Sequence, residues 1–416
     1  METYLVGGAV RDRLLGRPVA ERDHVVVGTT PEAMEALGFR PVGRDFPVFL
    51  HPQTHEEYAL ARTERKTARG YHGFRFNAAP EVTLEQDLAR RDLTINAMAE
   101  TNDGRLIDPF GGRRDLEDRL LRHVSPAFAE DPVRLLRVAR IAAQLDPWGF
   151  RVAPETGALL HELVSSGEVD ALVPERVWAE CEKALNSPAP LRFFEILRET
   201  GALEILFPEL ARLFGVPQPP RYHPEIDTGV HTWMVLSQAT RLSPKPEVRF
   251  AALVHDLGKG DTPAEILPSH RGHEERGVLR IRELSERLRI PNRYRDLAIK
   301  VARYHGLMHR FFELRPSTVV RLLEDIDALR RPDGLEAFLL AVEADFRGRG
   351  GGFAERPYPQ AEAARRAARA ASAVASQPLL DQGLRGEALG DALRRARGAA
   401  VAALDLQRLA PSRGDD

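Results

Sequence analysis

The chain has 416 residues, and its 59 lysines and arginines nearly balance 61 acidic residues, which gives a formal net charge of −2. This length predicts two to four domains. No apolar run approaches the roughly 18 residues of a membrane span, and the N-terminus has the features of neither a signal peptide nor a transit peptide. The single cysteine, Cys181, excludes an internal disulfide and a cysteine-rich zinc site. We therefore expect a cytoplasmic protein without a membrane segment, whose metals bind to histidines and carboxylates.

Residues 1–140 combine strand and helix patterns, whereas the rest of the chain shows helical periodicity. The predicted strands are Tyr4–Val6, His24–Val27, Phe46–Leu50 and Tyr58–Arg62. The predicted helices are Ala9–Leu15, Leu93–Glu100 and Pro132–Leu145, followed by Pro174–Leu185, Leu191–Thr200 and Gly229–Ala239 among others. The predicted fold class is therefore α+β, a mixed sheet with helices followed by an all-helical remainder.

Two breaks interrupt the helical part of the sequence. Proline-rich Gly215–Pro220 is a predicted linker, and Gly348–Gly352 precedes a tail rich in alanine and arginine. These features predict four parts: a head at 1–140, a helical neck and body at 141–225, a helical domain at 226–346 and a helical tail at 347–416.

The first predicted strand leads through Gly7 and Gly8 into a helix that carries Arg11. Glycines at such a turn let backbone amides approach a phosphate, and the helix N-terminus favours an anion. Arg11 can bind the same phosphates. Glu21 and Asp23 are two residues apart on a predicted strand, so both carboxylates should point to one face. This arrangement predicts a pair of Mg²⁺ ions that activates an attacking hydroxyl and holds a triphosphate.

Five motifs follow one another in this part of the chain. They are Gly7-Gly8-Ala9-Val10-Arg11-Asp12, Glu21-Arg22-Asp23, Arg90-Arg91-Asp92-Leu93-Thr94-Ile95-Asn96, Asp108-Pro109-Phe110-Gly111-Gly112 and Glu130-Asp131-Pro132-Val133-Arg134. In order and spacing they resemble the class II tRNA nucleotidyltransferase and poly(A) polymerase family, which has a polymerase-β-like head. The match continues to near the end of the chain and resembles the bacterial members in which an HD phosphohydrolase domain follows the head. One position departs from the family pattern, because Glu21 stands where the metal-binding pair usually begins with aspartate.

The resemblance implies template-independent addition of the 3′-terminal CCA of tRNA from CTP and ATP, with release of diphosphate. It implies that Glu21 and Asp23 are catalytic and bind Mg²⁺. It implies nucleotide contacts at Gly8, Arg11, Arg91, Asp92, Asn96, Asp131, Arg134, Arg137 and Arg140. Cytosine and adenine both present a ring-nitrogen acceptor beside an amino donor, which suits the donor of Arg134 and the acceptor of Asp131. Uracil and guanine present a donor where the arginine needs an acceptor.

The segment Asp45–Phe74 resembles a flexible loop of this family. Its Arg62, Glu64, Arg65 and Lys66 are candidates for coupling the bound nucleotide to the switch from C to A addition. A third head carboxylate is left open, with Glu57 and Glu64 as candidates. By the same resemblance, the neck and tail should bind the acceptor–TΨC side of tRNA through shape and phosphate contacts, in a monomer or homodimer.

A second group of potential metal ligands lies downstream, where His231 precedes the adjacent pair His255 and Asp256. Such a set can hold one divalent ion, and imidazole ligands favour Ni²⁺ or another transition ion over Mg²⁺. Water on that ion would attack a phosphoester. The pattern resembles the HD phosphohydrolase superfamily, in which His255 and Asp256 would be catalytic and Asp345 is the candidate closing metal ligand. The family context implies 2′,3′-cyclic phosphodiesterase, 2′-nucleotidase and phosphatase activity.

The sequence says less about the function of the other residues near this group. Lys259 is a candidate phosphate contact. Lone histidines are more often structural or exposed than metal ligands, which leaves His270, His273 and His309 without a predicted role. His305 lies in the same region.

Three other functions remain open at this point. A poly(A) polymerase shares the head, and a homopolymer tail on generic RNA would indicate it. An HD phosphohydrolase whose head only binds tRNA would hydrolyse phosphoesters without incorporating CMP. A purely structural RNA chaperone would leave both groups of metal ligands unexplained.

Overall fold

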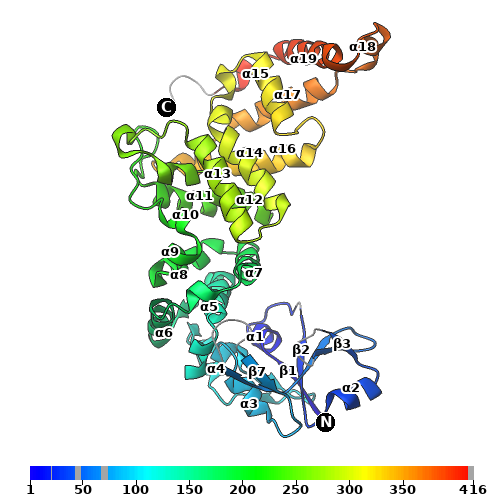
Figure 1. The fold of residues 1–416 in the computed structure, drawn as a ribbon, viewed down its shortest axis with the longest axis vertical. Coiled ribbons are helices and arrows are strands. Elements are labelled where there is room, and N and C mark those ends of the chain that lie inside the picture. The colour runs from blue at the N-terminus through cyan, green and yellow to red at the C-terminus, as the bar shows by residue number, and fades with distance from the viewer. Residues whose placement is uncertain (20, 43–47, 67–73, 411–416) are drawn as a thin grey trace. The chain divides into compact units, whose positions relative to one another are not determined.

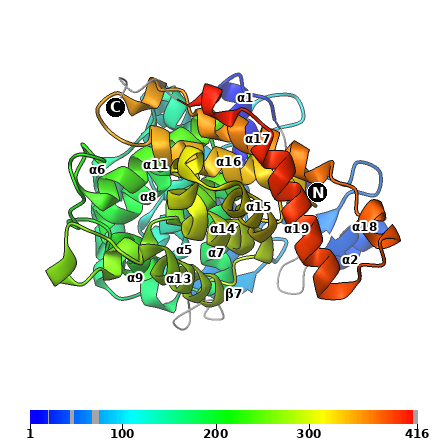
Figure 2. The ribbon, with the colours of Figure 1, turned by 90° about the horizontal axis from the view of Figure 1, so that it is seen from above.

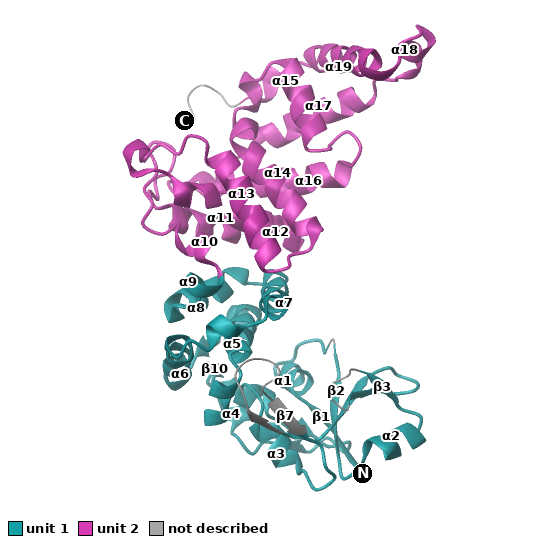
Figure 3. Cartoon of the chain, viewed as in Figure 1, with its two compact units in different colours: residues 1–206 teal, residues 207–416 magenta. Residues whose placement is uncertain are grey.

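The computed structural model describes residues 1–19, 21–42, 48–66 and 74–410, and the side chains of 64–66 and 74–76 are outside this description. The chain forms two compact units, residues 1–206 and 207–416 (Figure 3).

Unit 1 begins with a mixed seven-stranded sheet in the order β3-β4-β5-β2-β1-β8-β9 (Figure 1). Its strands are β1 Glu2–Val6, β2 Asp23–Val27, β3 Arg40–Val42, β4 Val48–Leu50, β5 Glu57–Leu60, β8 Ala99–Glu100 and β9 Leu106–Ile107. Strand β2 pairs antiparallel with β1 and parallel with β5. Because strand side chains alternate, Val25 packs in one buried cluster with Val6, and Val26 packs in another with Phe49. Both faces of the central strand are therefore covered.

A separate hairpin, β6 Thr63–Lys66 and β7 Phe74–Asn77, pairs antiparallel. The helices of unit 1 are α1 Gly8–Leu14, α2 Pro31–Ala36, α3 Leu84–Ala89, α4 Gly112–Glu117, α5 Val133–Leu145, α6 Pro154–Ser165, α7 Pro174–Leu185, α8 Pro190–Thr200 and α9 Ala202–Leu206. A pair of two-residue strands, β10 Leu120–Leu121 and β11 Arg151–Val152, also pairs in this unit. Helix α5 packs against α7 and α8, so the second half of unit 1 is helical.

One predicted helix, Leu93–Glu100, is wrong. The segment forms a 3₁₀ turn at Thr94–Asn96 and then strand β8. All eight of its residues are buried, so it has no exposed face and carries no amphipathic period. Helix α7 has the predicted ends, and the other predicted elements of unit 1 are present with shifted ends; residues 46 and 47 of one predicted strand are outside the description.

Unit 2 is helical. Its helices are α10 Pro208–Ala211, α11 Thr228–Leu242, α12 Pro246–Val254, α13 His273–Arg287, α14 Asn292–His309, α15 Pro316–Asp325, α16 Pro332–Arg347, α17 Pro359–Ser372, α18 Gln377–Asp381 and α19 Gly386–Ala402. Helices α11, α12 and α14 each pack on α16, and α14 lies beside α16 in both views (Figures 1 and 2). Small side chains such as Ala239, Ala252 and Ala344 line this contact.

Within the described residues, every helix is too short or too polar to cross a membrane.

Two candidate active sites

The turn between β1 and α1 requires glycine. Gly7 has a φ of +69°, and a Cβ built there would lie 2.9 Å from Arg91 Nη1. Only glycine adopts this conformation without strain and leaves room for the guanidinium. The turn therefore brings Arg91 next to the first turn of α1, where Gly8 and Arg11 also lie.

A chain of buried polar contacts connects four of the predicted nucleotide-binding residues. Arg11 Nη1 donates to Asn96 Oδ1 (2.8 Å), and Asn96 Nδ2 donates to Asp92 Oδ1 (3.0 Å). Arg137 Nε on α5 donates to Asp92 Oδ2 at 2.7 Å. Burial by itself would raise the pKa of Asp92, but Arg137 and the hydrogen bonds hold it well below its usual range. The ionised carboxylate thus positions residues from α1 and α5.

Asp87 orients the predicted site residue Arg91 and was not identified from the sequence. Its buried carboxylate accepts hydrogen bonds from Arg90 Nε (3.0 Å) and from Arg91 Nη2 (3.3 Å). Asp87 lies on α3, three and four residues before these arginines, which is a spacing that places side chains on one helix face. The contact of Asp87 with the two arginines could have been inferred from that spacing.

The predicted placement of Glu21 on a strand is wrong, because β2 begins at Asp23 and Glu21 precedes it. Both side chains are exposed. Asp23 lies in register with Val6 on β1 and with Glu57 on β5, so Glu57 is its closest strand neighbour with a carboxylate. Partial loss of water raises the pKa of Asp23, Arg91 opposes this, and Glu21 adds to it. Two exposed carboxylates, one just before β2 and one at its first residue, fit a magnesium ion, which prefers such oxygens.

The residues predicted to read the base have other partners in this conformation. Arg134 is buried and donates to the carbonyls of Arg90 (2.7 Å) and Ala127 (3.0 Å). Asp131 accepts from the backbone of Val133, and its other oxygen lies 3.4 Å from Arg176 Nη2.

Arg140 is oriented by a residue outside the motifs. Its Nε donates to the buried Glu180 on α7 at 2.5 Å. The loop residue Arg62 is described and its carbonyl accepts from Arg90 Nε (3.1 Å), whereas the side chains of Glu64, Arg65 and Lys66 lie outside the described residues.

The four residues predicted to form the second metal site converge in unit 2. His231 Nε2 lies 3.0 Å from Asp345 Oδ1 and 3.8 Å from Asp256 Oδ2. His255 Nε2 lies 3.2 Å from Asp256 Oδ2 and 3.5 Å from Asp345 Oδ1. All four side chains are buried. They come from α11, the end of α12, the following turn and α16.

Ring orientation in this cluster matches that of metal ligands. His255 Nδ1 donates to the carbonyl of Ala252 (2.8 Å), and His231 Nδ1 lies 2.8 Å from Glu225 Oε1. Each Nε2 therefore faces the carboxylates, as in metal-bound histidines. Burial alone would lower the pKa of His255, but Asp256 and Asp345 raise it to about 10. A divalent cation would balance the same carboxylate charge and displace that proton, so the residues fit a metal ion.

Glu225 supports the site and was not identified from the sequence. Its Oε1 lies 2.8 Å from His231 Nδ1 and 3.0 Å from His223 Nδ1, and its Oε2 accepts from the backbone amide of Gly350 at 2.9 Å. The signal was weak, because Glu225 follows the proline-rich segment that was predicted to be a linker. That segment is instead packed, with Gln218 buried.

Lys259 is also buried, and its Nζ lies 2.6 Å from both Asp256 Oδ2 and Gln218 Oε1. His270 has a structural role, because its two nitrogens bind Thr262 Oγ1 (2.7 Å) and the Pro217 carbonyl (3.0 Å).

Two other histidines contact the cluster directly. His309 Nε2 lies 2.7 Å from Asp345 Oδ2, and its Nδ1 lies 3.0 Å from the hydroxyl of Tyr358, at the start of α17. His305 Nε2 lies 3.7 Å from Asp256 Oδ1.

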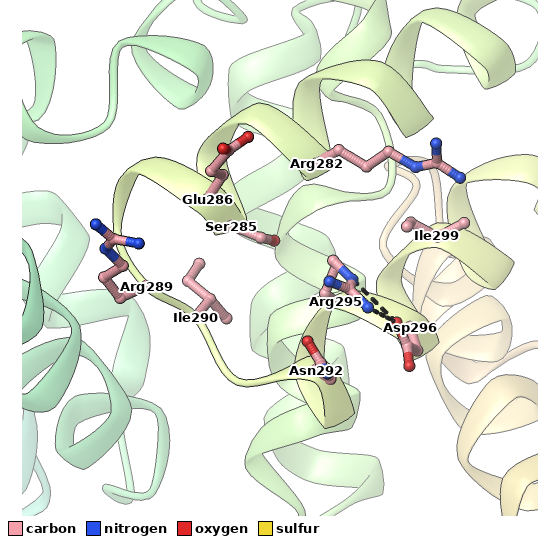
Figure 4. Close-up of a pocket in the computed structure, with 9 residues that line it drawn as sticks. All are labelled: Arg282, Ser285, Glu286, Arg289, Ile290, Asn292, Arg295, Asp296 and Ile299. Carbon is pink, nitrogen blue, oxygen red and sulfur yellow. Dashed lines mark hydrogen bonds and ion pairs between the residues drawn. The ribbon is translucent and has the colours of Figure 1, made fainter.

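A cavity of about 660 Å³ in unit 2 lies elsewhere, between α13 and α14 (Figure 4). Its lining residues are Arg282, Ser285, Glu286, Arg289, Ile290, Asn292, Arg295, Asp296 and Ile299. None of them belongs to the histidine and aspartate cluster, and Arg295 pairs with Asp296 at 2.8 Å.

Three family models match the chain in sequence order. They are a poly A polymerase head domain at residues 3–122, a probable RNA and SrmB-binding site of polymerase A at 149–214 and an HD domain at 228–331.

Individual proteins match over nearly the whole length. A multifunctional CCA protein from Methylococcus capsulatus is 69% identical over 98% of this chain and 96% of its own length. The CCA-adding enzyme of Bacillus stearothermophilus, solved in complex with CTP, is 26% identical with a TM-score of 0.64, over 96% of this chain and 88% of that one. The Thermotoga maritima CCA-adding enzyme, solved with tRNA_CCA, is 22% identical with a TM-score of 0.62, over 98% of this chain and 90% of that one.

Proposed function

Because the chain belongs to the multifunctional CCA protein family, we propose that it completes the 3′ CCA end of tRNA in unit 1 and hydrolyses phosphoesters in unit 2. The observation that carries the first activity is the hydrogen-bonded set Arg11, Asn96, Asp92 and Arg137. The Gly7 turn adjoins Arg91, and the charges of Arg91 and Arg137 act on Asp23.

In the proposed reaction, the 3′ hydroxyl oxygen of tRNA bonds to the α-phosphorus of CTP or ATP. The bond from that phosphorus to the β-phosphate oxygen breaks, and diphosphate leaves with the proton lost to solvent. Mg²⁺ held by Glu21 and Asp23 would lower the pKa of the attacking hydroxyl and offset the charge on the phosphates. Arg11 and Arg91, beside the Gly7–Gly8 turn, would bind the triphosphate.

Nucleotide selection is proposed for the start of α5. Asp131 and Arg134 would bind the shared edge of cytosine and adenine, after Arg134 exchanges backbone carbonyls for the base. Arg137 and Arg140 are already oriented by Asp92 and Glu180, which lowers the entropic cost of holding a nucleotide.

The test is extension of a tRNA transcript that lacks its CCA, with Mg²⁺ and CTP, ATP or both, followed on a sequencing gel. CTP alone should add two residues, ATP alone none, and both together three. A ladder of A residues would instead indicate a poly(A) polymerase. If no nucleotide is added, the result would favour the alternative in which the head only binds tRNA.

The second activity rests on the convergence of His231, His255, Asp256 and Asp345, whose Nε2 atoms lie 3.0–3.8 Å from the carboxylate oxygens. Ni²⁺ or another transition ion would suit these ligands and would supply an activated water. The proposed substrates are a 2′,3′-cyclic phosphate, a 2′-nucleotide and a phosphomonoester. Hydrolysis that requires added Ni²⁺ and disappears in Asp256→Asn would support this, and metal-independent hydrolysis would contradict it.

Other features remain part of the proposal. The head, neck, HD domain and tail are assigned to 1–140, 141–225, 226–346 and 347–416, with tRNA bound by the neck and tail. A cytoplasmic enzyme, active as a monomer or homodimer, is consistent with these substrates.

A further inference from the structure

We propose that Arg349 binds the phosphate group of the substrate at the phosphohydrolase site of unit 2. This inference rests on the proposed hydrolysis, because it assigns a substrate contact to that site. Arg349 lies in the glycine-rich segment Gly348–Gly352, which the sequence alone marked only as a break between helices.

The glycine-rich segment packs on residues that support the histidine and aspartate cluster. Gly348 follows the last residue of α16, and a Cβ there would lie 2.5 Å from a valine side chain of α11. The amide of Gly350 donates to Glu225 Oε2 (2.9 Å), and Glu225 Oε1 lies 2.8 Å from His231 Nδ1. The backbone of Arg349, between these two glycines, is therefore fixed beside the cluster.

Two aromatic rings support the guanidinium of Arg349. Its central carbon lies 5.6 Å from the centre of the Phe346 ring and 5.8 Å from that of the Phe353 ring. The Phe346 ring lies 6.3 Å from the ring of His309, whose Nε2 lies 2.7 Å from Asp345 Oδ2. Contact with the face of a guanidinium leaves its N–H groups, which point outward in the plane, for hydrogen bonds to a ligand.

Arg349 has no acceptor for its N–H groups within the part of the chain that the structure describes. Its Nε is buried there without a hydrogen-bond partner, and it forms no ion pair with a described carboxylate. The nearby Arg347, by contrast, pairs with Glu343 at 2.6 Å. A buried donor without an acceptor is costly, and a ligand that supplies oxygens explains it. Phosphate oxygens match the planar fork of arginine.

The positive charge of Arg349 acts on the cluster. Burial lowers the pKa of His309, and the charge of Arg349 lowers it further. The carboxylates of Asp256 and Asp345 would repel the oxygens of a phosphate group unless positive charge offsets them. Lys259 is already engaged, because its Nζ lies 2.6 Å from Asp256 Oδ2. Arg349 supplies a positive charge that no described carboxylate uses.

The test compares Arg349→Gln with the wild type, both as full-length chains loaded with Ni²⁺. We expect the affinity for inorganic phosphate, the product of monoester hydrolysis, to fall roughly 10- to 100-fold in calorimetric titration, because hydrogen bonds between charged groups are lost. The KM for p-nitrophenyl phosphate should rise by a similar factor. Bound nickel, counted by elemental analysis, and the circular dichroism spectrum should be unchanged.

Two further variants separate the geometry of the side chain from its charge. Arg349→Lys keeps the charge but loses the planar fork, so it should recover only part of the phosphate affinity. Arg330→Gln removes an exposed arginine of unit 2 and is the charge-matched control, which should bind phosphate as the wild type does. Any phosphate bound by unit 1 contributes equally in all of these proteins.

Unchanged phosphate affinity and KM in Arg349→Gln, with hydrolysis intact in the wild type, would overturn this inference alone. Loss of bound nickel in Arg349→Gln would overturn it as well, because Arg349 would then support the metal ligands rather than contact the substrate. If the wild type hydrolyses no phosphomonoester, the proposed phosphohydrolase function itself fails, and the inference fails with it.

Discussion

At the scale of single residues, the two units use buried carboxylates in the same way. Asp92 in unit 1 and Glu225 in unit 2 would not themselves meet the reacting atoms. Each accepts several hydrogen bonds and fixes the orientation of residues that would, Arg137 in one case and His231 in the other. Such supporting residues reduce the number of conformations that the site side chains can adopt before a substrate binds.

Asp23→Asn should abolish most nucleotide addition, because an amide binds Mg²⁺ more weakly than a carboxylate. We expect a loss on the order of 100-fold or more in CMP incorporation, as for loss of a principal electrostatic contact. Phosphoester hydrolysis in unit 2 should be unchanged, and so should stability, since Asp23 is exposed. Asp118→Asn, another exposed aspartate of unit 1, is the control. Wild-type incorporation by Asp23→Asn would refute its role as a metal ligand.

Glu225→Gln should weaken metal binding in unit 2. The amide keeps the size of the side chain but holds the proton of His231 Nδ1 less strongly, and changes of this kind typically lower metal affinity about 10- to 100-fold. Calorimetric titration with Ni²⁺ measures the effect. Glu265→Gln, at an exposed position, should leave the affinity unchanged. If both variants bind equally well, Glu225 does not orient the ligand.

Asp92 should make unit 1 sensitive to acid. Its pKa in the folded chain is below the unfolded value of about 3.9, so its stabilisation is present above that pH and is lost as the pH falls. Asp92→Asn should lower the free energy of opening near α5 by about 1–3 kcal/mol at pH 7 and by less at pH 3. Hydrogen exchange of α5 peptides measures both values. A loss that is the same at both pH values would mean that the carboxylate charge is not involved.

At the scale of elements, the sequence predicted those helices and strands that hydrophobic periodicity and the positions of proline and glycine indicate. Helix α7 begins and ends as predicted. It has proline at its first residue, and its buried residues recur at helical spacing on one face. Leu93–Glu100 was mispredicted because its complete burial leaves no polar face. His231, His255 and Asp256 were predicted to converge from their motif, and their side chains do lie together. Glu225 was not, because it lies just before α11 in a segment without helical or strand periodicity, and Tyr358 was not, because it comes from the start of α17, far from the motif in sequence.

Gly258→Ala should destabilise unit 2, because its Cβ would overlap the His273 carbonyl oxygen at 2.0 Å. Relief of such a contact requires backbone movement, which typically costs about 1–3 kcal/mol. Gly390→Ala is the matched control on α19, where a Cβ meets nothing within 4 Å, and it should be neutral or stabilising by up to about 1 kcal/mol. Urea unfolding compares the two. Equal stability of both variants would show that the turn has room at residue 258.

At the scale of the whole molecule, the chain carries two candidate sets of metal ligands with different chemistry. The oxygen-only set of unit 1 suits Mg²⁺, and the imidazole-rich set of unit 2 suits a transition ion. Both would act on the same chemical object, the 3′ end of tRNA. Hydrolysis clears a phosphate from that end, and transfer then needs a free 3′ hydroxyl. Composition and net charge gave no indication that one chain combines these two sites; only the motifs predicted it.

The most direct measurement uses a tRNA that lacks CCA and ends in a 2′,3′-cyclic phosphate, incubated with CTP, ATP, Mg²⁺ and Ni²⁺. The wild type should remove the phosphate and add three residues, whereas Asp256→Asn should extend only a matching transcript with a free 3′ hydroxyl. If Asp256→Asn extends the blocked tRNA as well as the wild type does, or if the wild type extends neither, the account of two cooperating sites is contradicted.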